Sequence, residues 1–291
     1  MRRLAIVLAV STTAMLLVPS CGADLEKQSQ LLERVRLLAL RADPPEADVS
    51  SGLPPPISFQ ALSYPDGGTT LRLALCGPGD PFSAGFDCPG SNGLDLPDLV
   101  LDASRPEVQA FFSARYGGLG GLDGGTNVTE PGVAQISIGY ELARIDAGSV
   151  AEDREDGVYR LAVRFSGHPN HNPELLDVTL ADGTPLQGAV LPLNQEIRLY
   201  PHIPDGGPGA IETFVGLDGG LQYERLSYSW SATAGEVVDY RSAEPMPDDP
   251  NATSDIRFRT HETPTPVSFY VVLRDLRGGT SFRVFDATIG P

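Results

Sequence analysis

Cys21 has the most specific chemical setting in this 291-residue sequence. It follows a start with two arginines, an apolar run over residues 4–18 and the small residue Ser20. A positively charged N-terminus, a short apolar stretch and a small residue before the cleavage site are typical of a secretory signal peptide. The apolar run is shorter than the about 20 residues that a transmembrane helix needs. We therefore expect residues 1–20 to be removed during export.

Val18-Pro19-Ser20-Cys21 resembles the bacterial lipobox, after which the signal is cleaved and the cysteine is lipidated. The resemblance implies acyl chains, palmitate among them, and a membrane anchor at Cys21, since several chains together hold a protein firmly. The alternative is an ordinary signal peptide with an incidental cysteine. An aspartate directly after the lipidated cysteine would resemble an inner-membrane retention signal, and this chain has Gly22 at that position. We therefore expect the outer membrane of the cell envelope, on either side.

Cys76 and Cys88 are the two other cysteines, and we expect them to form a disulfide bond. An exported chain enters an oxidising compartment, where disulfides persist. The bond would close a loop rich in glycine and proline, and in the chain-entropy model it contributes about 3 kcal/mol. A metal pair is the alternative. The spacing differs from Cys-x-x-Cys, and the sequence has no second pair.

Histidine and glycine patterns give weaker candidates, and we expect no catalytic residue, metal or other cofactor. His168 and His171 have ligand-like spacing but lie in a Pro- and Asn-rich stretch without a third ligand nearby. The Gly-x-Ser-x-Gly motif of a strained hydrolase nucleophile is absent. Residues 117–125 lack the third glycine of the dinucleotide fingerprint and the lysine of a P-loop, so they indicate a surface loop.

The acidic residues exclude one class of partner and suggest two weak alternatives. The net charge of −17 disfavours nucleic acid. Five aspartates between positions 80 and 102 could hold calcium, but their spacing is not that of an EF-hand, so we expect a solvated loop. The run at 152–156 could pair carboxylates for glycosidase chemistry, but its mixed charges indicate another solvated loop.

The elements that must position these residues are short strands. Abundant glycine (32) and proline (26) punctuate runs of alternating apolar residues, which is typical of an all-β sandwich. A short helix is expected from Asp102 or Ser104 to Tyr116, ended by Gly117. In the first half we predict strands at 35–41, 57–64, 69–76, 133–142 and 159–165.

Two Ig-like or fibronectin-like sandwiches are expected after a lipidated tether at 21–33. The first covers 34–167, with a long loop insertion at about 77–148, and 168–173 is a linker to the second at 174–291. Leu226, Tyr228 and Trp230 alternate with serines, so we expect Trp230 in the core rather than at a sugar site. The final hairpin, which turns at residues 278–279, suits an edge of the second sandwich.

Several stretches of the chain resemble exported Ig-like lipoproteins of GC-rich Gram-negative bacteria. They are residues 41–46, 172–174 with 182–186, 229–235 and 271–279. The resemblance does not extend over about 77–148. It implies the fold and the location and assigns no activity, because the family is functionally uncharacterised.

The leading functional hypothesis is a lipid-anchored envelope protein that acts as a non-catalytic structural or protein-interaction module. Its partners would be the membrane and an unidentified envelope protein, because loops on a rigid sandwich are common binding surfaces. A glycan-binding surface adhesin is the first alternative, with Phe111, Phe112 and Tyr116 as candidate aromatics. A hydrolase with an unrecognised site is the second.

Overall fold

The computed structural model describes residues 35–65, 67–78, 88, 93–118, 131–145, 154–207, 209–246, 249–275 and 277–291. The expected signal peptide, the tether and the lipidated Cys21 lie outside these ranges, so they stay predictions. Within the described ranges, no helix has the length and hydrophobicity to cross a membrane.

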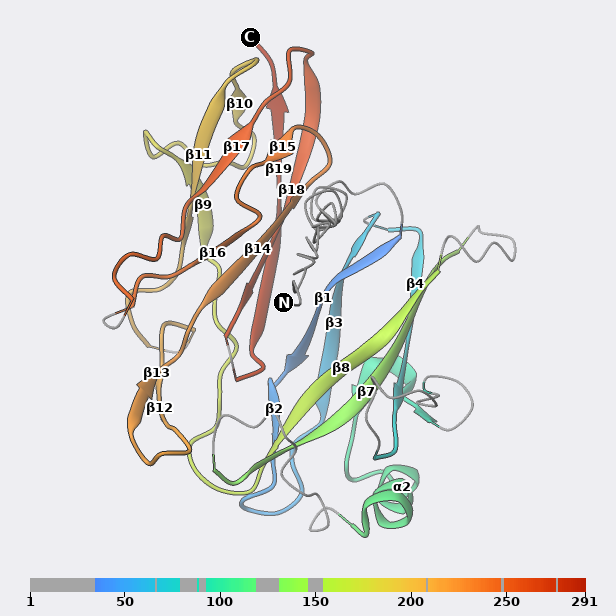
Figure 1. The fold of residues 1–291 in the computed structure, drawn as a ribbon. Coiled ribbons are helices and arrows are strands. Elements are labelled where there is room, and N and C mark those ends of the chain that lie inside the picture. The colour runs from blue at the N-terminus through green and yellow to red at the C-terminus, as the bar shows by residue number, and fades with distance from the viewer. Residues whose placement is uncertain are drawn as a thin grey trace, which may run out of the picture.

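Two facing sheets form the first sandwich (Figure 1). Its elements are β1 (Arg36–Asp43), β2 (Glu46–Asp48), β3 (Ile57–Tyr64), β4 (Thr69–Leu75), β5 (Leu94–Asp95), the 3₁₀ turn η1 (Pro97–Leu99), β6 (Val100–Leu101), α2 (Pro106–Tyr116), β7 (Val133–Arg144) and β8 (Arg154–Arg164). The strand orders are β1-β3-β6 and β2-β8-β7-β4-β5. Leu40 and Phe59 from the first sheet pack with Leu73, Ile136 and Leu161 from the second.

The expectation that residues at about 77–148 form a loop insertion is wrong where the structure describes them. Strand β7 lies between β4 and β8 in the larger sheet, so this stretch supplies a central strand. The helix begins at Pro106 after an N-cap at Arg105 that makes no side-chain cap. Asp102 instead accepts hydrogen bonds from the backbone and hydroxyl of Ser104, which fixes the preceding turn. Gly117 ends the helix as expected, with a left-handed φ of 67° that glycine adopts without strain.

A second pair of facing sheets follows the linker. Its elements are β9 (Asp177–Leu180), β10 (Val190–Leu191), β11 (Glu196–His202), β12 (Thr213–Val215), β13 (Leu221–Tyr223), β14 (Ser227–Ala232), β15 (Glu236–Val237), β16 (Arg241–Ala243), β17 (Ile256–Arg259), β18 (Thr265–Arg274) and β19 (Thr280–Ile289). The orders are β10-β19-β18-β14-β16 and β15-β17-β11-β9, and β12 pairs only with β13 as a separate ribbon. The prediction of an all-β fold of two sandwiches is therefore confirmed.

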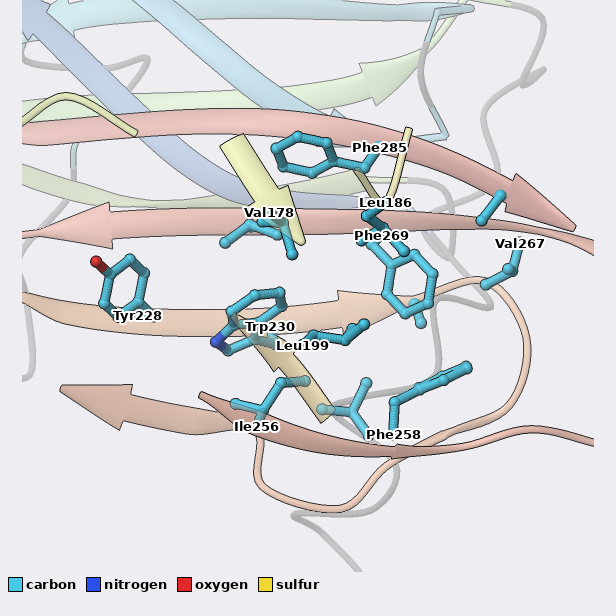
Figure 2. Close-up of a cluster of buried hydrophobic side chains, with 14 of the residues drawn as sticks. Val178, Leu186, Leu199, Tyr228, Trp230, Ile256, Phe258, Val267, Phe269 and Phe285 are labelled. Atoms are coloured by element: carbon cyan, nitrogen blue, oxygen red, sulfur yellow. The ribbon is translucent and has the colours of Figure 1, made fainter. Parts of the chain in front are cut away.

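The core of the second sandwich is built from alternate residues of both sheets. Trp230 and Phe269 project from one sheet towards Ile256 and Phe258 on the other (Figure 2). The rings of Phe258 and Phe269 meet edge to face with centroids 4.7 Å apart, a favoured geometry for aromatic pairs. Leu226, Tyr228 and Trp230 are all buried.

The β18–β19 hairpin lies in the middle of its sheet, so the expectation of an edge is wrong. Both of its faces are apolar. Phe269 and Val271 face the core, while Tyr270 and Val272 form a separate buried cluster with Ala39 of the first sandwich. A hairpin with both faces buried lies inside its sheet rather than at the edge. Here β10 lies beside β19, and β14 followed by β16 lies beside β18.

Candidate functional site

The junction between the sandwiches contains a network of buried charges. Arg164 at the end of β8 donates two hydrogen bonds to Glu46 of β2, Nε to Oε1 at 2.6 Å and Nη2 to Oε2 at 3.0 Å. Both side chains are 2% exposed. Arg164 lies on the face of β8 opposite the core residues Leu161 and Val163, and at the junction that face is buried rather than exposed. Such a pair is tolerated in the interior because its hydrogen bonds satisfy both charges.

Asn170 of the linker connects this pair to the second sandwich. Its backbone N–H donates to Glu46 Oε1 at 2.7 Å, and its amide Nδ2 donates to Asp275 Oδ2 at 3.1 Å. Asp275 also accepts from the backbone N–H groups of Arg277 and Gly279 in the β18–β19 turn. Burial raises the pKa of Asp275, although these hydrogen bonds favour its charged form. Asn170 therefore hydrogen-bonds the linker to both sandwiches.

Arg277 extends the network to the β12–β13 ribbon. Its Nη1 lies 2.8 Å from Glu224 Oε1 and 3.2 Å from Glu212 Oε2, two residues that face each other at the open end of the ribbon, where the Glu224 N–H donates to the Glu212 carbonyl. Its guanidinium also lies over the ring of Phe214, 5.2 Å from the centroid. Burial, with the nearby Asp275 charge, raises the pKa of Glu224 to about 7. One buried arginine thus holds the base of the ribbon.

A groove of about 370 Å³ opens beside the network, between the end of β1 and the linker. Arg41 and Asp43 line it from the first sandwich, and Asn170 and His171 line it from the linker. Arg41 Nε and Asn170 Oδ1 are buried without a hydrogen-bond partner among the described residues. The amide of Asn170 is committed to Asp275, so its oxygen faces away from that carboxylate. The junction thus contains one unsatisfied donor and one unsatisfied acceptor.

The β12–β13 ribbon presents apolar side chains to solvent. Leu221 and Leu217 are 70% and 67% exposed, and Val215 and Tyr223 are about half exposed. Phe214, on the other face of the ribbon, is partly buried against Arg277. Contiguous exposed apolar side chains on a soluble domain commonly mark contact surfaces.

The expected disulfide is confirmed. Cys76 follows β4 directly and is bonded to Cys88, with Cα atoms 6.0 Å apart. Tyr116 donates a hydrogen bond to the Cys76 carbonyl at 2.8 Å, so helix α2 packs against the same strand end. The bond therefore ties Cys88 to the end of β4.

The two linker histidines are not brought together as metal ligands. His171 Nδ1 lies 2.6 Å from Glu212 Oε1, whereas the His168 backbone carbonyl accepts from Arg277. The sequence places these histidines in a linker without a third ligand, and in the structure both contact the junction network. Among the described residues, no three histidine, cysteine or acidic side chains cluster as a metal site, and this includes Asp95, Asp98 and Asp102.

The aromatic residues considered for glycan binding do not form an exposed platform. Phe112 is buried, and Phe111 and Tyr116 pack against the core of the first sandwich. Burial raises the pKa of the Tyr116 hydroxyl to about 12. The prediction of a glycan site at these three rings is therefore wrong, because they pack in or against the core of the first sandwich.

The described part of the run at 152–156 is strand rather than loop. Glu155 on β8 accepts hydrogen bonds from the Leu37 backbone at 2.9 Å and from the Tyr140 hydroxyl at 3.3 Å. Glu152 and Asp153 lie outside the described residues.

Sequence reasoning missed the charged residues of the junction. Glu46 and Arg164 lie 118 positions apart, and nothing local indicates their pairing. A weak signal was present in Asp275-x-Arg277, two charges in a hairpin turn between two strongly apolar strands. A turn of that kind normally faces water, and here it faces the linker.

Comparisons with known proteins identify no family. No protein-family model and no curated protein matches the chain. Among solved structures, the C-terminal domain of the Streptococcus agalactiae AgI/II polypeptide BspA is 11% identical, covering 89% of this chain and 81% of that one, with a TM-score of 0.22. Domains 4 and 5 of the S-layer protein SbsC are 8% identical over 89% and 100% of the two chains, with a TM-score of 0.19. At these scores the assignment of the fold depends on the strand orders and the two cores.

Proposed function

We propose that this chain is a lipid-anchored protein of the cell envelope that acts as a non-catalytic structural and protein-interaction module. The anchor is Cys21, and the outer membrane is the expected location. The proposal depends for its location on the charged start, the apolar run and the four residues ending at Cys21.

The junction is the observation that carries the structural part of the proposal. Its buried charged side chains are engaged with one another and with backbone groups, and an apolar cluster with Ala39, Leu62, Tyr270 and Val272 lies on the same interface. Flexible two-domain chains have polar, wet interfaces that allow relative motion. An interface that combines an apolar cluster with buried paired charges favours one fixed arrangement, which suits a spacer or scaffold.

The anchor is tested by metabolic labelling with palmitate in a bacterial host. Wild type should incorporate label and sediment with outer membranes, and the Cys21→Ser variant should do neither. Unlabelled wild type in the soluble fraction would contradict the anchor without affecting the fold.

The interaction is tested by photo-crosslinking in intact envelopes. A photoreactive residue replaces Leu221 on the exposed ribbon, and the matched control replaces Leu53, an exposed leucine of the first sandwich. We expect one reproducible crosslinked envelope protein at Leu221 and none at Leu53. Equal, scattered crosslinks at both positions would contradict an interaction through the ribbon.

A further inference from the structure

A second hollow, of about 360 Å³, lies at the open edge of the second sandwich. Its size is within the about 300–1,000 Å³ typical of small-ligand pockets. The arginines that line it come from three strands in both sheets: Arg198 from β11, Arg241 from β16 and Arg257 from β17 (Figure 1). Three guanidinium groups therefore converge in a chain whose net charge is −17.

Two of these arginines are neutralised inside the hollow. Arg198 Nη1 lies 2.8 Å from Asp255, and Arg257 holds Asp239 with Nε at 2.8 Å and Nη2 at 3.0 Å. The hydrogen bonds from Arg257 lower the pKa of Asp239, so this carboxylate is charged at neutral pH. These pairs also relieve the repulsion between Arg198 and Arg257, which lie directly opposite each other in the sheet.

Arg241 has no such partner. Its guanidinium lies 5.5 Å from the centroid of the Tyr240 ring, and within the ranges that the structure describes no carboxylate forms an ion pair with it. The side chains that line the hollow therefore carry one positive charge in excess, and Glu196, outside the lining, lies 3.7 Å from Arg257 Nη1. A guanidinium is a planar fork of donors that matches a carboxylate through two parallel hydrogen bonds.

The rest of the lining is hydrophilic. Asp239 accepts three hydrogen bonds from Arg257, one of them from its backbone N–H, and Asp255 accepts one from Arg198, so each carboxylate keeps acceptor capacity. Ser242 and Thr253 bring hydroxyl-bearing side chains to the hollow. Ser242 already accepts from the Trp230 indole and donates to the Ser254 carbonyl, so its position is fixed. A ligand that fits this lining has one carboxylate and several hydroxyl groups, with little apolar surface.

We propose that this hollow binds an acidic sugar, with the sugar carboxylate on Arg241 and its hydroxyl groups on Asp239 and Asp255. The aspartates accept hydrogen bonds from sugar hydroxyls, which a simple anion cannot donate. This site is separate from the aromatic residues of helix α2 and does not depend on the proposed interaction module.

The test is a titration of the full chain, purified in detergent, with glucuronate, followed by ligand-observed NMR. We expect saturable binding in wild type, and about tenfold weaker binding in the Arg241→Gln variant from loss of one charge-assisted hydrogen-bonded contact. Arg72→Gln is the matched control, because Arg72 is an exposed arginine paired with Asp95 on the first sandwich. It should bind as wild type does. Unchanged thermal unfolding of both variants shows that the fold is intact.

Glucose and inorganic sulfate separate the two parts of the recognition. Glucose lacks the carboxylate and sulfate lacks the hydroxyl donors, so each should bind at least several times more weakly than glucuronate. The proposal is overturned if glucuronate does not saturate, if either probe binds as well as glucuronate, or if Arg241→Gln leaves the affinity unchanged.

Discussion

Glu46 and Arg164 are the residues on which the junction depends most. Their ion pair is almost completely buried, and Glu46 also accepts the backbone N–H of Asn170. Removing one charge of a buried pair leaves the other without compensation in a medium of low polarity. The stability of the protein should therefore be far more sensitive here than at exposed ion pairs.

Glu46→Gln should lower the free energy of unfolding by about 3–5 kcal/mol, because it leaves the Arg164 charge buried and unpaired. Urea unfolding followed by tryptophan fluorescence and by circular dichroism measures the loss. Asp95→Asn, at the exposed pair with Arg72, is the control and should leave the midpoint nearly unchanged. Equal, small effects of both changes would show that Arg164 is not buried with Glu46.

Glu224 makes the stability depend on pH. Its pKa is raised from 4.5 to about 7, so between these values the folded chain holds a proton that the unfolded chain has released. Stability therefore falls as pH rises through this window. The glutamine of a Glu224→Gln variant does not titrate, whereas Asp275, Arg277 and Glu212 stay in place.

The difference in unfolding free energy between wild type and Glu224→Gln should therefore shift in favour of the variant between pH 5 and pH 7.5, by on the order of 2 kcal/mol. Glu262→Gln removes one exposed carboxylate and is the control for the loss of a negative charge. A flat difference for Glu224→Gln would mean that Glu224 is ionised throughout.

At the scale of elements, the disulfide joins Cys88 to the end of β4. Cys76 and Cys88 are separated by 12 positions, and their bond limits the conformations of the unfolded chain. Replacing both with alanine should lower the unfolding free energy by about 3 kcal/mol in the chain-entropy model. Unfolding of the oxidised protein in a Cys21→Ser background, with and without reductant, gives an independent measure. Identical midpoints under both conditions would contradict this role.

Individual strands were predictable where local chemistry delimits them. The strand at 57–64 was predicted to the residue, because three prolines precede it and a Pro-Asp-Gly-Gly turn follows. The strand containing Trp230 was recognisable because apolar residues alternate with serines. Both signals lie within a few residues of the element that they define.

Pairings between distant strands were not predictable. The last hairpin was expected at an edge, and nothing local in its sequence indicates what its second face packs on. The second face packs on Ala39 and Leu62, residues more than 200 positions earlier in the chain. The junction charges were missed for the same reason, since Glu46 and Arg164 pair across 118 positions and Asn170 and Asp275 across 105.

At the scale of the molecule, the two sandwiches share one apolar interface. Tyr64 and Tyr270 meet edge to face across it with centroids 6.0 Å apart, and Arg274 Nη2 donates to the Leu38 carbonyl at 2.8 Å. The interface lies beside the buried charges of the linker. Disrupting it should therefore separate the sandwiches without unfolding either core.

Val272→Asp should open this interface, because it places a charge in the apolar cluster. Limited proteolysis should then cut within the linker at 168–173 severalfold faster than in wild type, and each sandwich should stay resistant. Val190→Asp, at an exposed valine of β10, is the matched control and should leave the cleavage rate unchanged. Resistance of the linker in Val272→Asp would show that the cluster does not hold the junction.

The most direct test of the account is a distance measurement between the two sandwiches. Spin labels on Leu53→Cys and Val190→Cys, both at exposed positions, report one distance across the junction in the full chain with Cys21→Ser. Pulsed electron–electron double resonance should give a single narrow distribution of distances between the labels, because the buried charges and the apolar cluster fix one arrangement. A broad distribution would mean that the sandwiches move independently, and it would contradict a rigid module.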